Sequence, residues 1–219
     1  MIQAVLFDMD GVLVDSERQI CLAAIQMFKE SGVTVQPDDF LPFVGAGENR
    51  YIGGVAEKYG IQLDIDTAKF RTYTIYGEMV HGKIEPLAGV REFIANCRAL
   101  SIKTAIATSA DFMKMEINLR EIGLPAKTFD ATVNGLEVIN KKPSPDIYLT
   151  AARKVGVEPA HCLVVEDAIN GVQAAKAAGM LCLALTTSFS ADKLDQADWI
   201  CRDLSDALMR YPDIFQSES

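Results

Sequence analysis

Apolar residues recur along the chain with two different spacings. Between residues 16 and 82 they recur every three or four positions, which places them on one face of a helix. In the first such segment this face carries Ile20, Ala23, Ala24, Met27 and Phe28. The pattern predicts a helix that begins at Ser16 and Glu17 and ends near Gly32, and further helices over about 48–59 and 66–80.

From Lys83 onward, short apolar runs alternate with helical patterns. The runs that have the length of strands lie at 103–108, 129–133, 162–165, 181–185 and 198–201. The helical patterns between and after them lie at 111–121, 145–155, 168–178 and from about 204. This alternation is typical of right-handed crossovers in a parallel sheet. The first apolar run, residues 2–7, must join that sheet because an isolated strand is not stable.

Local helix-end signals refine these predictions. Asp66 or Thr67 is the expected cap of the helix over 66–80, and Ser144 is the expected cap of the helix over 145–155, which Gly156 ends. The fold class is therefore α/β: a doubly wound, Rossmann-like parallel-sheet core with an inserted α-helical cap domain. Residues 1–15 and 83–219 form the core, and residues 16–82 form the cap.

Composition narrows the class of protein. The chain has 219 residues, of which 49% are hydrophobic, so it can bury a core and is not a disordered protein. Its net charge of −9 argues against sequence-independent binding of nucleic acid, which needs basic patches. The negative net charge does not exclude a phosphorylated small-molecule partner, because a local cation or metal can make the electrostatic potential at a binding site positive.

The apolar runs and the cysteines of the chain indicate where it is located and how it assembles. No apolar run approaches the roughly 20 residues of a membrane span, and no signal-peptide pattern is present. The five cysteines are dispersed and have no zinc-ligand spacing, so we expect free thiols. We therefore expect a cytoplasmic protein without a membrane partner, and nothing requires more than a monomer.

Two carboxylates, Asp8 and Asp10, directly follow the apolar run 4–7 and precede Gly11. Carboxylates so close together repel each other and resist ionisation unless a cation neutralises them. Oxygen ligands of this kind suit Mg²⁺. The motif predicts a metal-bound aspartate nucleophile with a second aspartate as acid and base, although an ordinary acidic turn is the alternative for this motif alone.

Three later segments also end in polar residues. Thr108 and Ser109 suit a phosphate oxygen, Lys142 suits the charge of a phosphoryl group, and Glu166 and Asp167 form a second acid pair after a strand. Taken singly, each has an ordinary alternative: a helix cap for the first and last, a solvated loop for the lysine. Together they supply a phosphate cradle, a cationic clamp and a further metal ligand for the first motif.

With these motifs the chain resembles the haloacid dehalogenase (HAD) superfamily of phosphotransferases over its whole length. The matching segments are Asp8-Met9-Asp10-Gly11-Val12, Thr108-Ser109, Lys142 before Pro143, and Glu166-Asp167 with Gly171 downstream. The stretches 142–148 and 166–172 look like the β-phosphoglucomutase-like subgroup. As a set these motifs are highly specific, although each is weak alone.

The resemblance implies that Asp8 attacks a phosphate monoester and forms an aspartyl-phosphate. Asp10 would protonate the leaving alkoxide and then deprotonate the hydrolytic water. Because dehalogenases of this superfamily lack the second aspartate, its presence favours phosphate esters over haloacids.

The resemblance also implies a Mg²⁺ cofactor. The carboxylates of Asp8 and Asp167 and the backbone carbonyl of Asp10 would hold the ion, with Glu166 as a direct or indirect partner. Thr108, Ser109 and Lys142 would hold the phosphoryl oxygens.

Substrate selection falls to the cap, which would close over the site through hinges at 14–16 and 82–86. Gly45 and Arg50 lie in the expected specificity loop, and Glu17 begins the first cap helix. The alternatives are a flexible loop with a solvated arginine, and a first-turn carboxylate that favours the helix dipole.

β-Phosphoglucomutases carry a histidine near Ile20 and a cationic residue before the loop glycine, where this chain has Val44. These departures favour a phosphatase for a small sugar or polyol phosphate over a mutase. A phospho-ligand sensor with low turnover is the remaining alternative.

Overall fold

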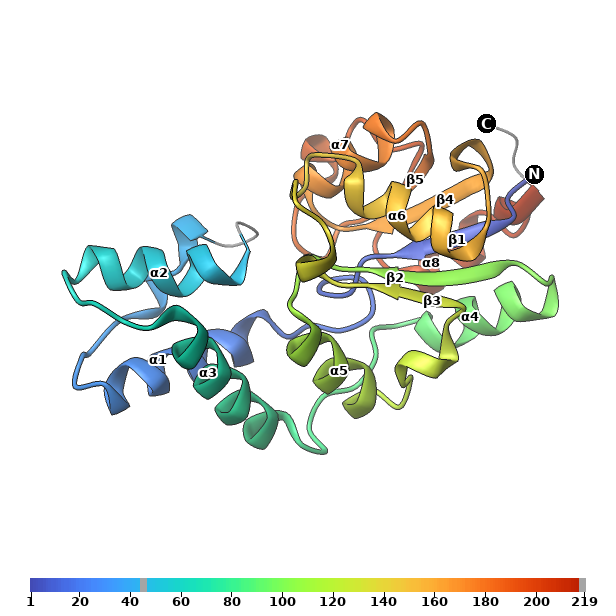
Figure 1. The fold of residues 1–219 in the computed structure, drawn as a ribbon. Helices are drawn as coiled ribbons and strands as arrows, with labels where there is room; N and C mark the ends of the chain where they lie inside the picture. Colours follow the sequence, from blue (N-terminus) through green and yellow to red (C-terminus); the bar gives the residue numbers. More distant parts are fainter. Residues whose placement is uncertain (44–46, 217–219) are drawn as a thin grey trace.

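The computed structural model describes residues 1–43 and 47–216 and has two parts, a sheet-based core and a helical lobe beside it (Figure 1). The core is built on a six-stranded sheet of order β3-β2-β1-β4-β5-β6, in which every neighbouring pair is parallel. Its strands are β1 (Ala4–Phe7), β2 (Lys103–Ala107), β3 (Ala131–Val133), β4 (Cys162–Glu166), β5 (Leu181–Leu185) and β6 (Trp199–Cys201).

The central strand β1 is buried on both faces. Val5 and Phe7 join the apolar cluster on one face, and Ala4 and Leu6 join the cluster on the other, because successive side chains of a strand point to opposite sides. Helices α6 (Asp146–Val155) and α7 (Ile169–Ala177) cover one face, and α4 (Val90–Ala99), α5 (Phe112–Glu121) and α8 (Leu204–Arg210) supply the other cluster. The predicted doubly wound α/β fold is confirmed.

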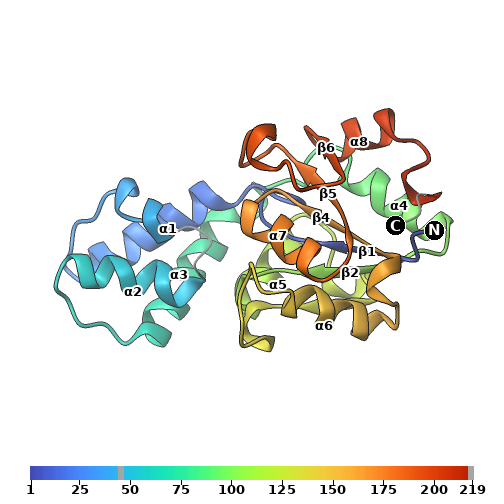
Figure 2. The same ribbon diagram turned by 90° about the horizontal axis from the view of Figure 1, so that it is seen from above.

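Three helices form the lobe, and all lie within the predicted insert 16–82. They are α1 (Glu17–Glu30), α2 (Glu48–Lys58) and α3 (Ile65–Val80). Helices α1 and α3 pack side by side, and Figure 2 shows the lobe standing beside the edge of the core that carries the start of α7. Two chain segments join the lobe to the core, as an insertion requires. Among the described residues, no helix is both long and apolar enough to cross a membrane.

Several element ends differ from the sequence-based predictions. The sequence analysis placed no helix over α4, although Val90, Phe93, Ile94 and Cys97 carry a helical spacing. The predicted cap of α3 is wrong, because Asp64 caps this helix and its carboxylate accepts a 2.8 Å hydrogen bond from the Thr67 backbone.

The cap predicted for α6 is also wrong. Pro145 holds the cap position, and the Ser144 hydroxyl instead donates to the Asp146 side chain at 2.7 Å. In both helices the predicted polar residue lies close to the start of the helix, but a residue one to three positions away occupies the cap. The five cysteines are free thiols, as predicted.

Candidate active site

The carboxyl ends of three adjacent strands bring the predicted site residues together. In the sheet register Phe7 of β1 lies beside Ile106 of β2 and Val165 of β4, so the segments that follow these strands begin at one level. They enter a cavity of about 290 Å³. Its lining includes Asp8, Asp10, Glu17, Thr108, Ser109, Lys142, Glu166 and Asp167, with Ser188 and Phe189 from the segment after β5.

Lys142 links two carboxylates at the base of this cavity. Its Nζ lies 2.5 Å from Asp8 Oδ1 and 2.6 Å from Glu166 Oε1, and 4.9 Å from the centre of the Tyr148 ring. Burial alone would lower the pKa of Lys142, but the carboxylates of Asp8 and Glu166 raise it above its ordinary value. The lysine is thus held as a cation at the nucleophile.

Asp8 itself is poorly solvated. Burial raises the pKa of its carboxyl, the cation of Lys142 lowers it and the nearby charge of Glu166 raises it, and together they give a pKa of about 7. The net direction is upward, so one lysine does not compensate fully for the negative charge gathered here. A further cation is needed for Asp8 to ionise readily at neutral pH.

Glu166 uses both carboxylate oxygens within the protein. Besides Lys142, Oε1 accepts a 2.8 Å hydrogen bond from the Tyr148 hydroxyl. Oε2 accepts from the backbone N–H groups of Asp167 and Ala168 at 2.8 and 2.9 Å. Burial opposes ionisation, but Lys142 and these donors lower the pKa of Glu166 below its ordinary value. This arrangement suits a residue that holds Lys142 in place, and its role as a metal partner stays a prediction.

Asp167 occupies the side of the cavity nearest Gly11. The Ser188 hydroxyl donates to its Oδ2. Burial raises the pKa of Asp167 well above its ordinary value, and the charges of Glu166 and Asp8 add to this. Gly11 has a φ of 75°, and a Cβ there would lie 1.9 Å from Asp167 Oδ2, so only glycine allows this approach.

The carboxylates of Asp8 and Asp167 fit the Mg²⁺ that the sequence motifs imply. In the described part of the chain, no three side chains of His, Cys, Asp or Glu form a complete metal cage. Mg²⁺ ordinarily takes only one or two carboxylates and completes its octahedron with water and substrate phosphate. Two buried carboxylates with raised pKa values in one cavity match this donor set.

Asp10 is held by a separate network on the cap side. Its Oδ2 accepts from Lys114 Nζ at 2.9 Å, and its Oδ1 accepts from Asn118 Nδ2 at 3.2 Å and from the Ser16 hydroxyl. Sequence analysis missed Lys114 and Asn118. The available signal was a polar pair four residues apart on the buried face of α5, directly after the second motif.

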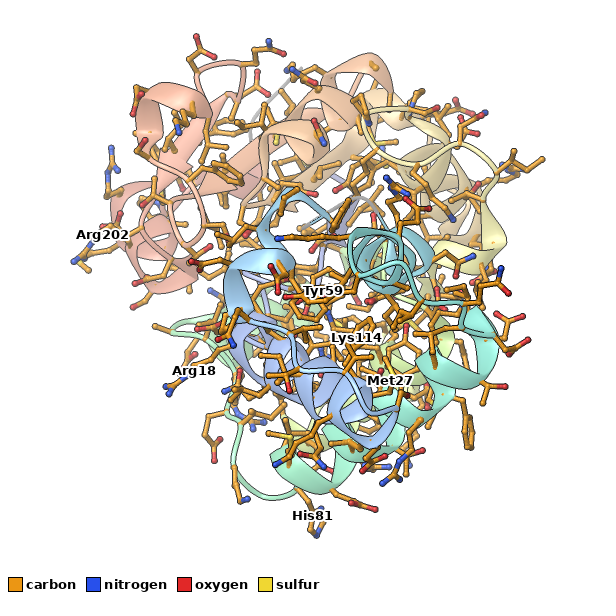
Figure 3. All side chains as sticks on the ribbon, turned by 90° about the vertical axis from the view of Figure 1, so that its left-hand side faces the viewer. Arg18, Met27, Tyr59, His81, Lys114 and Arg202 are labelled. Atoms are coloured by element: carbon orange, nitrogen blue, oxygen red, sulfur yellow. The ribbon has the colours of Figure 1, made fainter. Side chains whose placement is uncertain are left out.

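This network also reaches the cap helices. Lys114 Nζ lies 3.7 Å from Glu48 Oε1 at the start of α2, and the Tyr76 hydroxyl of α3 donates to Asn118 Oδ1. Lys114 is almost fully buried, and Figure 3 shows it well inside the outline of the molecule when viewed from the cap side. Asp10, which is predicted to act as acid and base, is therefore linked to cap helices α2 and α3 through Lys114 and Asn118.

The cap residues predicted to contact substrate have different outcomes. Glu17 lines the catalytic cavity. Arg50 does not, because its guanidinium pairs with Glu57 Oε2 at 2.7 Å and lies 5.1 Å from the centre of the Phe43 ring. Gly45 lies outside the described residues. Of the two that the structure describes, Glu17 lies in the site and Arg50 does not.

Replacing Lys114 with methionine should misplace the acid without removing the nucleophile. We expect kcat/KM for an alkyl phosphate to fall about tenfold to a hundredfold, part of what general acid catalysis contributes. The loss should be much smaller for p-nitrophenyl phosphate, since nitrophenolate leaves without a proton. Steady-state kinetics on both esters measure this difference.

Lys69→Met is the matched control for that experiment. Lys69 is also a buried lysine between cap and core, where it pairs with Asp111 at 3.0 Å, but it does not contact Asp10. Loss of stability alone would affect both variants alike. Equal losses on the two esters, or the same selective loss in Lys69→Met, would show that Lys114 does not position Asp10.

Comparisons with known proteins agree with this geometry. A family model described as haloacid dehalogenase-like hydrolase matches residues 2–179. The chain is 44% identical over 200 residues to Protein SUPPRESSOR OF QUENCHING 1, chloroplastic, of Arabidopsis thaliana, covering 90% of this chain but 19% of that protein. It is 33% identical over 178 residues to the phosphorylated carbohydrates phosphatase of Thermotoga maritima, covering 81% of this chain and 82% of that protein.

A solved structure extends the similarity to the whole architecture. The structure of a CbbY mutant from Rhodobacter sphaeroides in complex with xylulose-(1,5)bisphosphate superposes with a TM-score of 0.84 at 28% identity. The alignment covers 94% of this chain and 96% of that one. The likeness therefore includes both the sheet core and the cap.

Proposed function

We propose a Mg²⁺-dependent phosphatase activity for this chain, which belongs to the haloacid dehalogenase-like hydrolase family. The predicted family and the predicted class, a HAD-like phosphoric monoester hydrolase, are confirmed by the family match and by phosphatase-named relatives. The substrate we propose is a small sugar or polyol phosphate. The observation that carries the proposal is the single cavity that Asp8, Lys142 and Asp167 line together with Asp10 and Glu17 of the cap.

In the first step Asp8 attacks phosphorus in line with the ester oxygen. A bond forms between the carboxylate oxygen and phosphorus, the ester P–O bond breaks, and Asp10 gives its proton to the departing alkoxide. Lys142 Nζ, already at the nucleophile, stabilises the charge on the phosphoryl oxygens. The Thr108 hydroxyl accepts from the Ala110 backbone at 3.1 Å, which orients it, and Ser109 lines the same cavity.

In the second step Asp10 takes a proton from water, and the water oxygen attacks phosphorus. The bond between phosphorus and Asp8 breaks, inorganic phosphate leaves, and the carboxylate is restored. Lys142 Nζ lies 2.5 Å from Asp8 Oδ1. The carboxylate that leaves phosphorus in this step therefore has a cation beside it to stabilise its charge.

The metal would be held by the carboxylates of Asp8 and Asp167 and by the backbone carbonyl of Asp10. When bound, Mg²⁺ supplies positive charge that offsets the repulsion among these carboxylates and the phosphate. Glu166 contributes by fixing Lys142 through its Oε1 and the chain after β4 through its Oε2.

Mg²⁺ should stabilise the folded protein. At a hundredfold excess over its Kd we expect the Tm to rise by about 5–10 °C for a chain of this size. Scanning calorimetry with Mg²⁺ and with EDTA measures the shift. Asp167→Asn should abolish it, and Asp195→Asn, a change at an exposed position, should leave it unchanged. A shift that persists undiminished in Asp167→Asn would place the ion elsewhere.

The two alternatives that the sequence left open, a sugar-phosphate mutase and a phospho-ligand sensor, receive less support. Ile20, where mutases carry a histidine, lines a small cavity beside Asp10 and offers no acid or base to a sugar hydroxyl. For a sensor, the complete set of Asp8, Asp10 and Lys142 in one cavity would be superfluous. Formation of glucose 6-phosphate from β-glucose 1-phosphate by the purified protein would overturn the choice of phosphatase over mutase.

The direct test is phosphate release from a panel of sugar, polyol and nucleotide monophosphates with Mg²⁺ or EDTA. The proposal predicts release that depends on Mg²⁺ and is fastest for a sugar or polyol ester. Release that is equal in EDTA, or confined to nucleotides, would contradict it.

A further inference from the structure

A second, smaller cavity lies between cap and core and is lined by Asp10 but not by Asp8 or Lys142. Its volume is about 70 Å³. It shares Asp10, Glu17, Ser109 and Ala110 with the catalytic cavity, so the two spaces adjoin. Asp10 is the proposed proton donor to the leaving alkoxide, so the alcohol part of the ester must lie on this side.

The lining of this smaller cavity is rich in carboxylates. Glu17 from α1 and Glu48 from α2 join Asp10, and the Tyr51 side chain and the apolar Ile20 and Phe43 complete much of the wall. Lys114 is the one cation among the described residues that line it.

The charge of Lys114 is already taken by the protein. Its Nζ lies 2.9 Å from Asp10 and 3.7 Å from Glu48, and its side chain is 4% exposed. Arg50, two residues after Glu48 along the chain, pairs with Glu57 and lines neither of the two cavities. Among the described residues, the lining thus offers a bound ligand several carboxylate oxygens and no uncommitted positive charge.

We propose that Glu17 and Glu48 select phosphate monoesters whose alcohol part carries hydroxyl or ammonium groups, and that they exclude esters with a second phosphate. This inference rests on the proposed phosphatase function and specifies its substrate class. A carboxyl group bonds to a sugar hydroxyl whether it is ionised or neutral, and it attracts an ammonium group when ionised. A second phosphate needs cations or N–H donors, and here it would face like charge.

Paired esters with one carbon skeleton test the inference. We compare kcat/KM for fructose 6-phosphate against fructose 1,6-bisphosphate, and for glucosamine 6-phosphate against glucose 6-phosphate, with p-nitrophenyl phosphate as a general phosphatase substrate. The wild-type protein should prefer the monophosphate over the bisphosphate by about tenfold or more, since juxtaposed like charges are costly at an enclosed site. It should use glucosamine 6-phosphate at least as well as glucose 6-phosphate.

Glu48→Gln separates charge from shape, because glutamine has nearly the size of glutamate. We expect this variant to lose most of its preference against the bisphosphate, with Glu17→Gln acting in the same direction. Glu78→Gln is the control, since Glu78 is an exposed cap carboxylate that lines neither cavity. It should keep the wild-type preference.

The outcomes are distinguishable. A wild-type enzyme that hydrolyses bisphosphates as well as monophosphates overturns the inference and leaves the phosphatase proposal intact. An unchanged preference in both glutamine variants also overturns it, because shape alone would then explain the exclusion. No hydrolysis of any ester, including p-nitrophenyl phosphate, overturns the phosphatase proposal and this inference with it.

Discussion

Replacing Asp8 with asparagine should abolish phosphate release. Asparagine keeps the shape of the side chain but cannot attack phosphorus, so the route through a covalent intermediate is closed. We expect kcat/KM to fall by at least about 10⁴-fold, as for other enzymes that lose their nucleophile. A coupled phosphate assay on the preferred ester measures the loss, and residual turnover near the wild-type rate would show that Asp8 is not the nucleophile.

The same variant should differ from wild type in the pH dependence of its stability. Burial raises the pKa of Asp8 from 3.8 to about 7, so the folded state binds a proton here that the unfolded state has already lost. This contribution to stability is fully present below about pH 4 and disappears as pH rises through about 7. In EDTA, Asp8→Asn should lack this decline, and denaturant unfolding between pH 4 and 8 compares the two proteins. Parallel curves would contradict the assigned environment of Asp8.

Lys142→Met should damage both catalysis and stability. The variant loses the cation at Asp8 and leaves the buried carboxylate of Glu166 without its main partner. We expect kcat/KM to fall by about a hundredfold to a thousandfold, the effect of removing one preorganised charge at a developing anion. Unpairing these buried carboxylates should cost about 3–5 kcal/mol of unfolding free energy in EDTA.

The neighbouring lysine provides a close control. Lys141 Nζ donates to the backbone carbonyls of Gly135 and Val138, away from the catalytic carboxylates. Lys141→Met should therefore retain wild-type kcat/KM, and Lys142→Arg should not restore it, because the planar guanidinium does not fit a point-charge site between two carboxylates. Equal kinetic losses at both lysines would show that a general basic loop, rather than Lys142, serves the reaction.

The core of the site was predictable from sequence because its chemistry lies at strand ends. Asp8, Thr108 and Asp167 each follow an apolar run, and a parallel sheet brings the carboxyl ends of adjacent strands to one edge. Strand length and local polarity were therefore enough to predict which residues meet. Lys142 needed the resemblance as well, since a lysine before proline is ordinarily a solvated loop residue.

The surroundings of Asp10 were not predictable in this way. Lys114 and Asn118 reach it from helix α5, 104 and 108 residues along the chain. The four-residue spacing of this polar pair places both side chains on one face of the helix but does not show which carboxylates they meet. The position of Lys114 and Asn118 on a helix, and not at the end of a strand, is what hid this network.

Side-chain direction in the cap was also not predictable from the sequence. Its helices followed from apolar periodicity, but side-chain direction did not, so Arg50 was predicted to contact substrate and instead pairs with Glu57. Glu48, which the sequence analysis did not select, faces the site because it starts α2 beside Lys114. Helix phase relative to a partner is a tertiary property, and it decides which polar residue of a cap meets the substrate.

In the proposed reaction Asp8 carries the phosphoryl group between two steps that both need Asp10. The most direct measurement is the mass of the peptide containing Asp8 after Asp10→Asn is mixed with p-nitrophenyl phosphate and Mg²⁺ and quenched in acid. Nitrophenolate needs no proton to leave, so the first step proceeds, but the water of the second step lacks its base. We predict a burst of about one nitrophenolate per protein and a phosphoryl group on Asp8. Steady turnover without a burst and an unmodified Asp8, or a phosphoryl group on another residue, would contradict the account.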